Sequence, residues 1–185
     1  MLAVQISELS GPDAVRVVDV PEPEPAHMLT PGEGVLIDVA AAGVSFPEVL
    51  QTRGLYQLKP DLPFVPGAEV GGTVISTPAS SGLQPGDRVM AFTGLGGMAE
   101  RAVAPAYMTF PLPDALDFNQ GASIILNYHT VYFALKLRGQ LKAGESVLVH
   151  GAAGGVGTAA LQVAKALGAA TIAVVSTEEK ERIAR

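Results

Sequence analysis

The glycine-rich stretch at residues 150–157 constrains the fold of this chain more than any other part of its sequence. It reads His-Gly-Ala-Ala-Gly-Gly-Val-Gly and follows a short apolar run at 147–149. Residues 155–167 then place apolar side chains at helical spacing, and a second apolar run follows at 171–175. A strand, a tight turn, a helix and a second strand in this order form a parallel βαβ unit. We therefore expect the C-terminal part of the chain to begin an α/β domain.

The same turn fits the dinucleotide fingerprint G-x-G-x-x-G, whose three glycine places are filled by Ala152, Gly154 and Gly157. Alanine in the first place departs from the pattern. Glycine in the second place lets a pyrophosphate approach the backbone, and glycine in the third lets the helix pack on the strand. A phosphate would lie at the positive N-terminus of the helix. The alternative is a tight turn without a ligand. The predicted cofactor-binding residues of the turn are Gly151, Ala152, Ala153, Gly154, Gly155, Val156 and Gly157.

The residues after the second strand favour NADP over NAD. An NAD-binding unit places Asp or Glu about 20 residues beyond the glycines to hold the ribose 2′-hydroxyl, and Ser176 occupies that place here. Serine does not repel a 2′-phosphate, and Lys180 can neutralise one. We therefore add Ser176, Thr177 and Lys180 to the predicted NADP(H) site. In the alternative, Ser176 or Thr177 only caps the next helix, Lys180 is a solvated charge, and Glu178 is a rival ribose ligand.

The first part of the chain has a different texture, and we place the domain limits at 1–115 and 116–185. Short strand-like runs alternate with turns rich in Gly and Pro before residue 115, as in an all-β barrel or sandwich. One helix interrupts them at 46–53 and ends at Gly54. Asp117 and Gln120 form a capping box that opens a helix which Gly139 ends. The expected strands are 2–6, 15–20, 35–44, 72–76, 88–92 and 100–110.

Composition excludes several classes of function. The chain has no cysteine, which removes disulfides and thiolate zinc sites. Its net charge is −6, and no basic patch for nucleic acid stands out. The three histidines, His27, His129 and His150, lack metal-ligand spacing, so we expect no metal. The N-terminus is a poor signal peptide. Five glycines interrupt the apolar stretch 147–175, so we expect no membrane span and a cytoplasmic protein.

Several short sequence motifs occur in the order in which a known family has them. The chain resembles the medium-chain dehydrogenase/reductases, specifically their zinc-independent quinone oxidoreductase branch. This resemblance implies a β-rich GroES-like catalytic domain followed by the start of a Rossmann domain, which is a doubly wound parallel sheet with helices on both faces. The motifs are AGVSFPEVL at 42–50, RGLY at 53–56, PFVPGAE at 63–69, PGDRV at 85–89, GMAE at 97–100 and KAGESVLVHGAAGGVG at 142–157.

The resemblance also bears on the chemistry. Zinc-dependent members have Cys where Ser45 stands and His where Ala68 stands. With neither residue present, the resemblance implies hydride transfer to a quinone or an α,β-unsaturated carbonyl compound without zinc. Ser45 takes the place that is Asn in many zinc-free members, and we keep it as a catalytic candidate.

Three further candidates come from the resemblance. Tyr56 would line the substrate cleft and hydrogen-bond a carbonyl or donate a proton; alternatively it is a half-buried aromatic with its hydroxyl in water. Phe46 and Thr130 fall where family members contact the nicotinamide, although Thr130 also fits an ordinary helix-face residue. Asn127 and His129 are weaker candidates.

Members of the family are close to twice as long as these 185 residues. We therefore expect one βαβ unit with exposed strand edges instead of a full doubly wound sheet. Two hypotheses follow: an NADPH-dependent quinone or enone reductase, or a truncated, catalytically inactive GroES-like module that serves in binding. A third is that the sequence is an incomplete record. The expected partner is a small-molecule substrate, with a homodimer as an option.

Overall fold

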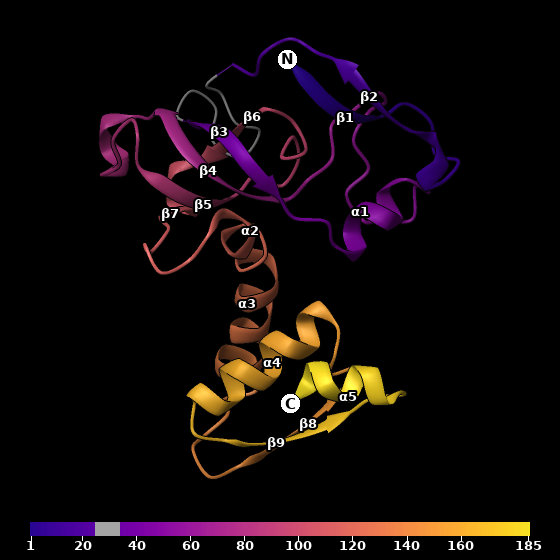
Figure 1. The fold of residues 1–185 in the computed structure, drawn as a ribbon, viewed down its shortest axis with the longest axis vertical. Helices are drawn as coiled ribbons and strands as arrows, with labels where there is room; N and C mark the ends of the chain where they lie inside the picture. Colours follow the sequence, from indigo (N-terminus) through magenta and orange to yellow (C-terminus); the bar gives the residue numbers. More distant parts are fainter. Residues whose placement is uncertain (25–33) are drawn as a thin grey trace. The chain divides into compact units, whose positions relative to one another are not determined.

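The computed structural model describes residues 1–24 and 34–185, which form two compact units, Met1–Ile125 and Leu126–Arg185 (Figure 1). The change in sequence texture at 115/116 comes before this division. Helix α2 (Phe118–Gly121) belongs with the first unit because it packs on β3, β4 and β5. One close approach is at Gly71, where a β-carbon would collide with the Phe118 carbonyl. The domain limits at 115 and 116 stay a prediction.

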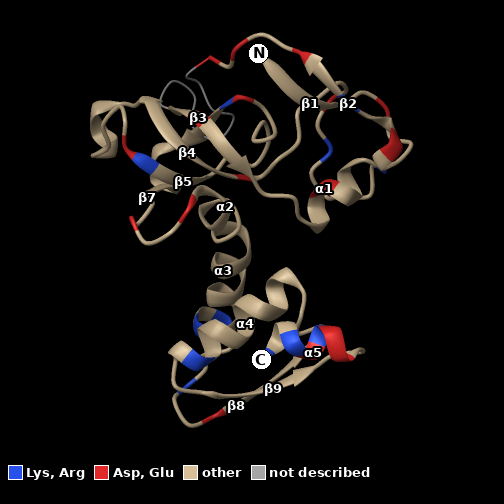
Figure 2. Ribbon diagram, in the orientation of Figure 1, with Lys and Arg blue, Asp and Glu red and all other residues tan. Residues whose placement is uncertain are grey.

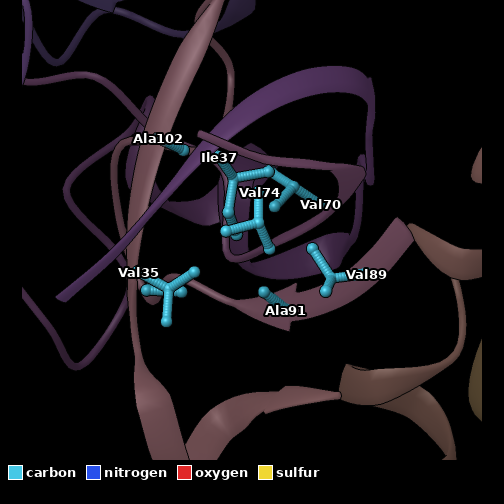
Figure 3. Close-up of a cluster of buried hydrophobic side chains, with 8 residues drawn as sticks. Val35, Ile37, Val70, Val74, Val89, Ala91 and Ala102 are labelled. Atoms are coloured by element: carbon cyan, nitrogen blue, oxygen red, sulfur yellow. The ribbon is translucent and has the colours of Figure 1, made fainter. Parts of the chain in front are cut away.

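The first unit is built on a five-stranded antiparallel sheet with the strand order β6-β3-β4-β5-β7. Its strands are β3 (Gly34–Ala42), β4 (Glu69–Ser76), β5 (Arg88–Phe92), β6 (Arg101–Pro105) and β7 (Thr109–Pro111). Small and β-branched side chains from four of them meet in one buried cluster (Figure 3). Its members are Val35, Ile37, Val70, Val74, Val89, Ala91, Ala102 and Ala104. The β-rich texture of the sequence thus gives the expected β-rich unit.

The single strand expected at 100–110 is wrong. The chain forms β6, a 3₁₀ turn η3 (Ala106–Met108) and then β7. Strand β6 pairs with β3, whereas β7 pairs with β5 at the far edge of the sheet. Pro105 and the turn redirect the chain, because proline lacks the N–H that a continuing ladder needs. The local apolar pattern is the same for one long strand and for two short ones.

A second, two-stranded sheet pairs β1 (Leu2–Ile6) with β2 (Val15–Asp19), and a 3₁₀ turn η1 (Pro12–Ala14) connects them. A backbone bridge between Ile6 and Phe64 joins β1 to the segment before β4. Helix α1 (Phe46–Gln51) ends before the expected residue 53, and Gly54 follows with a φ of 64°. A 3₁₀ turn η2 (Ala79–Ser81) lies between β4 and β5.

The capping box at Asp117 is confirmed: its carboxylate accepts from Gln120 N at 2.8 Å, and Gln120 Oε1 accepts from Asp117 N at 2.9 Å. The helix that it opens is not continuous, however. It breaks after α2 and resumes as α3 (Ile125–Tyr132), which continues into a π-helical segment η4 (Phe133–Arg138). The segment closes with Gly139 N donating to Ala134 O at 2.7 Å. Apolar spacing alone does not distinguish one helix from these pieces.

The second unit contains the predicted βαβ arrangement. Strands β8 (Ser146–His150) and β9 (Ala170–Val174) pair in parallel, and helix α4 (Gly155–Ala166) connects them. Helix α5 (Glu178–Ala184) follows, and Figure 1 shows α4 and α5 on one side of the two strands. The buried core on that side joins α3 and α4 to β8 through Val131, Val149 and Ala160.

The other side of the β8–β9 pair is open to solvent. Leu148 and Ile172 lie opposite each other in the register, and each is 56% exposed. Parallel strands are usually covered on both faces, whereas no described element covers this face of the β8–β9 pair. The structure thus has exposed apolar side chains on β8 and β9, as the sequence led us to expect. Within residues 1–24 and 34–185, no helix combines the length and apolarity needed to cross a bilayer.

Gly72 allows β3 and β4 to approach each other, because a β-carbon there would lie 2.7 Å from Ile37 Cγ2 and closer still to Asp38 O. We expect Gly72→Ala to lower the free energy of unfolding by about 2 kcal/mol, the usual range for overpacking. Ser76→Ala on the exposed end of the same strand should change it by less than about 0.5 kcal/mol. Urea unfolding of the two variants measures the difference, and equal stabilities would contradict the packing argument.

Candidate functional site

The turn after β8 leads directly into α4 and leaves a row of backbone N–H groups at the helix start. Gly151 turns the chain with a φ of 63°, and Gly154 N donates to Gly151 O at 3.0 Å. Gly154 is the N-cap in an extended conformation, and its carbonyl accepts from Thr158 N at 2.8 Å. The N–H groups of the first helical turn have no carbonyl partner within the helix. They and the helix dipole favour an anion at this end.

A pocket of about 470 Å³ lies beside this turn. It is formed where β8 and β9 end, which is the place where open α/β sheets bind ligands. Lys180 is the charged side chain among its described lining residues, and it gives the pocket a positive charge. The lining residues are Gly151, Ala153, Gly154, Val174, Val175, Ser176 and Lys180.

The two fingerprint glycines serve different purposes. At Gly157, a β-carbon would lie 2.7 Å from Ala152 Cα and closer still to Gly151 O, so the contact of α4 with the turn requires glycine. At Gly154, the nearest atom would be Gly151 O at 3.4 Å, an ordinary contact, and the φ of −83° suits any residue. Since the protein itself does not need glycine at 154, the bare backbone there fits close approach by a ligand from the pocket.

Ala152, in the first fingerprint place, belongs to the framework of the turn. It is fully buried, and its N–H donates to Val174 O at 3.2 Å, which ties the turn to the end of β9. A methyl group is accommodated in this place because it points into the core that α4 and β8 share. Val156, by contrast, is 52% exposed on the first turn of α4.

The structure separates the roles of Ser176 and Thr177. Thr177 is the N-cap of α5, with its hydroxyl accepting from Lys180 N at 3.3 Å. Ser176 is left to line the pocket, and its hydroxyl accepts from Lys180 Nζ at 3.1 Å. Figure 2 shows acidic residues at the start of α5 beside basic ones. Glu178 belongs to that acidic first turn and is not among the residues that line the pocket.

Thr130 lies on α3 in the second unit, and its hydroxyl donates to Leu126 O at 2.6 Å within the helix. The neighbouring Tyr128 hydroxyl donates to Gln162 Oε1 at 2.6 Å and so links α3 to α4. Thr130 is exposed and is not a lining residue of the pocket. The structure thus brings together the glycine turn, Ser176 and Lys180 around one pocket, with Thr130 apart from it.

The remaining candidates belong to the first unit. Ser45 is the N-cap of α1, Phe46 is its first residue and is 71% exposed, and Tyr56 is half-buried just beyond Gly54. The exposure of Phe46 leaves its ring free for contact with a ligand.

Glu48 is a buried residue next to the candidates Ser45 and Phe46 that the sequence reasoning missed. It is 5% exposed, with Oε2 accepting from Ser45 N at 2.9 Å and Oε1 accepting from Ala68 N at 3.2 Å. Its carboxylate therefore joins the two segments in which zinc-dependent sequences carry their Cys and His. The S-x-x-E capping-box spacing at Ser45 is the signal that points to half of this arrangement.

No group of three or more His, Asp or Glu side chains within the described ranges is arranged to hold a metal ion. His129 lies on α3, and His150 is the last residue of β8. His27 lies outside the described residues.

Comparisons with known proteins place this site in context. The alcohol dehydrogenase GroES-like domain matches residues 31–114. Quinone oxidoreductase of Homo sapiens is 41% identical over 186 residues, which cover 99% of this chain and 55% of that protein. This chain thus spans about half the length of the curated quinone oxidoreductases that it matches.

Solved structures agree with the sequence matches. A probable oxidoreductase from Mycobacterium abscessus superposes with a TM-score of 0.87 at 49% identity, covering 99% of this chain and 59% of that one. Escherichia coli quinone oxidoreductase in complex with NADPH gives 0.87 at 32% identity, covering 100% and 55%.

The surroundings of the two fingerprint glycines predict different effects of alanine on the free energy of unfolding. Gly157→Ala should lower the free energy of unfolding by about 2 kcal/mol, because the new methyl group would overlap the Gly151–Ala152 backbone. Gly154→Ala should change it by no more than about 0.5 kcal/mol, since it meets only an ordinary contact. Thermal unfolding of both variants without any ligand is the measurement. A large loss at Gly154 would contradict a role reserved for ligand approach.

Proposed function

Because this chain belongs to the medium-chain dehydrogenase/reductase family, with quinone oxidoreductases as its relatives, we propose that the protein reduces a quinone or an α,β-unsaturated carbonyl compound without zinc. The cofactor is NADP(H), which supplies the hydride when bound. The observation that carries the proposal is the pocket beside the glycine turn, with bare backbone at Gly154 and a cation at Lys180. The match to the GroES-like domain and the similarity to quinone oxidoreductases support an oxidoreductase activity.

The glycine turn would hold the pyrophosphate. Its first-turn N–H groups, from Gly155 to Gly157, face no helical carbonyl and can donate to phosphate oxygens. Gly154 leaves the room that a phosphate needs, and Gly157 keeps α4 close enough for those N–H groups to stay in place. Ala153 completes the wall of the pocket beside Gly154.

Ser176 and Lys180 would hold the 2′-phosphate of the adenosine ribose. The ammonium and hydroxyl already lie 3.1 Å apart in the pocket, so one phosphate can accept from both. Thr177 supports them by starting α5 at the residue that places Lys180 one turn later. A carboxylate at position 176 would instead repel this phosphate and favour a free ribose hydroxyl.

The acceptor would be oriented by the nicotinamide end of the cofactor and by hydrogen bonds from the protein. Tyr56 is proposed to donate its hydroxyl proton, or a hydrogen bond, to the carbonyl oxygen on which negative charge develops. Phe46 and Thr130 are proposed contacts of the nicotinamide, and Ser45 a further polar group near the acceptor. Ala68 offers no side-chain ligand for zinc, and the Ser45 and Ala68 backbone N–H groups donate to Glu48.

Cytoplasmic location and a homodimer stay predictions.

The cofactor assignment makes a charge-specific prediction. Lys180→Ala should raise the dissociation constant for NADPH about tenfold, the effect of losing one charge-assisted hydrogen bond at a partly solvated site. Affinity for NADH should not change, because NADH lacks the 2′-phosphate. Lys165→Ala, which removes an exposed lysine at the other end of α4, is the matched control. Fluorescence titration with both cofactors measures the constants. Equal losses for NADPH and NADH, or a wild-type preference for NADH, would contradict the assignment.

The proposed chemistry is tested by turnover. NADPH oxidation by the full-length protein should proceed with a quinone or an alkenal and should be unaffected by a zinc chelator. Tyr56→Phe should lower kcat/KM for the acceptor about tenfold to a hundredfold, with KM for NADPH unchanged. Tyr107→Phe, at a tyrosine that is 62% exposed in the same unit, should have no effect. Absence of turnover across several acceptors would refute the enzyme and favour a binding module, and a chelator-sensitive activity restored by zinc would refute the zinc-free mechanism.

A further inference from the structure

Gly155 is a glycine that the dinucleotide fingerprint does not explain. The three defined places fall at 152, 154 and 157, so any residue is allowed at 155. Gly155 is the first residue of α4, a position that other residues readily occupy. Its φ is not among the positive values of the chain, so no turn requires glycine there. A reason for this glycine must come from its surroundings.

The side chain of Asn127 occupies the space that a side chain at 155 would need. A β-carbon on Gly155 would lie 3.0 Å from Asn127 Nδ2, 3.2 Å from Oδ1 and 3.3 Å from Cγ. All three atoms belong to the side-chain amide, so the amide lies beside the position that a β-carbon at 155 would take. This contact joins α3 to the first residue of α4.

Neighbouring contacts limit how far Asn127 can move. The Tyr128–Gln162 hydrogen bond at 2.6 Å fixes α3 against α4, and Val131 is buried against the same helix. Asn127 itself is half-buried. No hydrogen bond among the described residues involves its side-chain amide, so hydrogen bonding within the protein does not explain its place.

We infer that Asn127 is a positioning residue for NADPH binding that acts through Gly155. By lying beside Gly155, the amide sets where the first turn of α4 begins and therefore where the N–H groups of Val156 and Gly157 point. The inference rests on the proposed function, because the pyrophosphate is the group that those N–H groups would bind. Glycine at 155 is then required by Asn127, and glycine at 154 by the ligand.

Two single variants and their combination test the pair in the full-length protein. Gly155→Ala should raise the dissociation constant for NADPH about tenfold, because its methyl group pushes against the amide. Asn127→Ala should raise it about threefold, because the first turn loses its support. In the double variant, the alanine methyl at 155 fills the space of the lost amide, and the constant should return to within about threefold of wild type. KM for NADPH should follow the same order.

Gly154→Ala is the matched control, because no Asn127 atom is among the neighbours of a β-carbon there. It should weaken NADPH binding, and Asn127→Ala should not relieve it. If Asn127→Ala relieves both alanine variants equally, or neither, the inference is overturned.

Thermal unfolding without cofactor separates positioning from a purely structural role. Coupling between 127 and 155 in the melting temperature but not in NADPH affinity would show that Asn127 only packs the unit, which would overturn the inference. If the wild type itself does not bind NADPH, the proposed function fails first and this inference falls with it. That outcome is seen before any variant is compared.

Discussion

The close approach of α4 to the turn before it, at Gly157, is the contact on which the second unit depends. With no side chain at 157, the helix can lie against the Gly151–Ala152 backbone, and Ala152 can fill the core beneath it. That contact fixes the helix N-terminus beside the ends of β8 and β9. The pocket, its open N–H groups and its lysine all follow from this placement, so a packing requirement creates the electrostatic site.

In the first unit, a buried carboxylate has a comparable organising role. Glu48 accepts from Ser45 N and Ala68 N, and so it holds the start of α1 to the segment that enters β4. A buried carboxylate is stable only when such donors compensate its desolvation. The same side chain therefore shapes the region around Ser45 by hydrogen bonds to the backbone. At positions 45 and 68 this chain has Ser and Ala, where zinc-dependent sequences have the metal ligands Cys and His.

The glycines of one short turn illustrate how similar residues meet different demands. Gly151 supplies a positive φ, Gly157 a close helix contact, and Gly154 open backbone beside the pocket. Gly155 is the exception to the fingerprint, and it faces a side chain that lies 28 positions earlier in the sequence (155 minus 127). A motif read along the chain cannot include that partner, because the contact exists only once α3 packs on α4.

The sequence by itself determined the local features: the β-rich first part, the capping box at Asp117, the βαβ order, and a glycine turn followed by Ser176 and Lys180. These depend on residues close together in the chain, where spacing and backbone preference act directly. The tertiary structure decided the rest. It split the strand expected at 100–110 so that β6 and β7 pair at opposite edges, and it chose Thr177 as the cap of α5. It also joined Glu48 to Ala68 and Asn127 to Gly155, since such contacts form only when distant segments pack together.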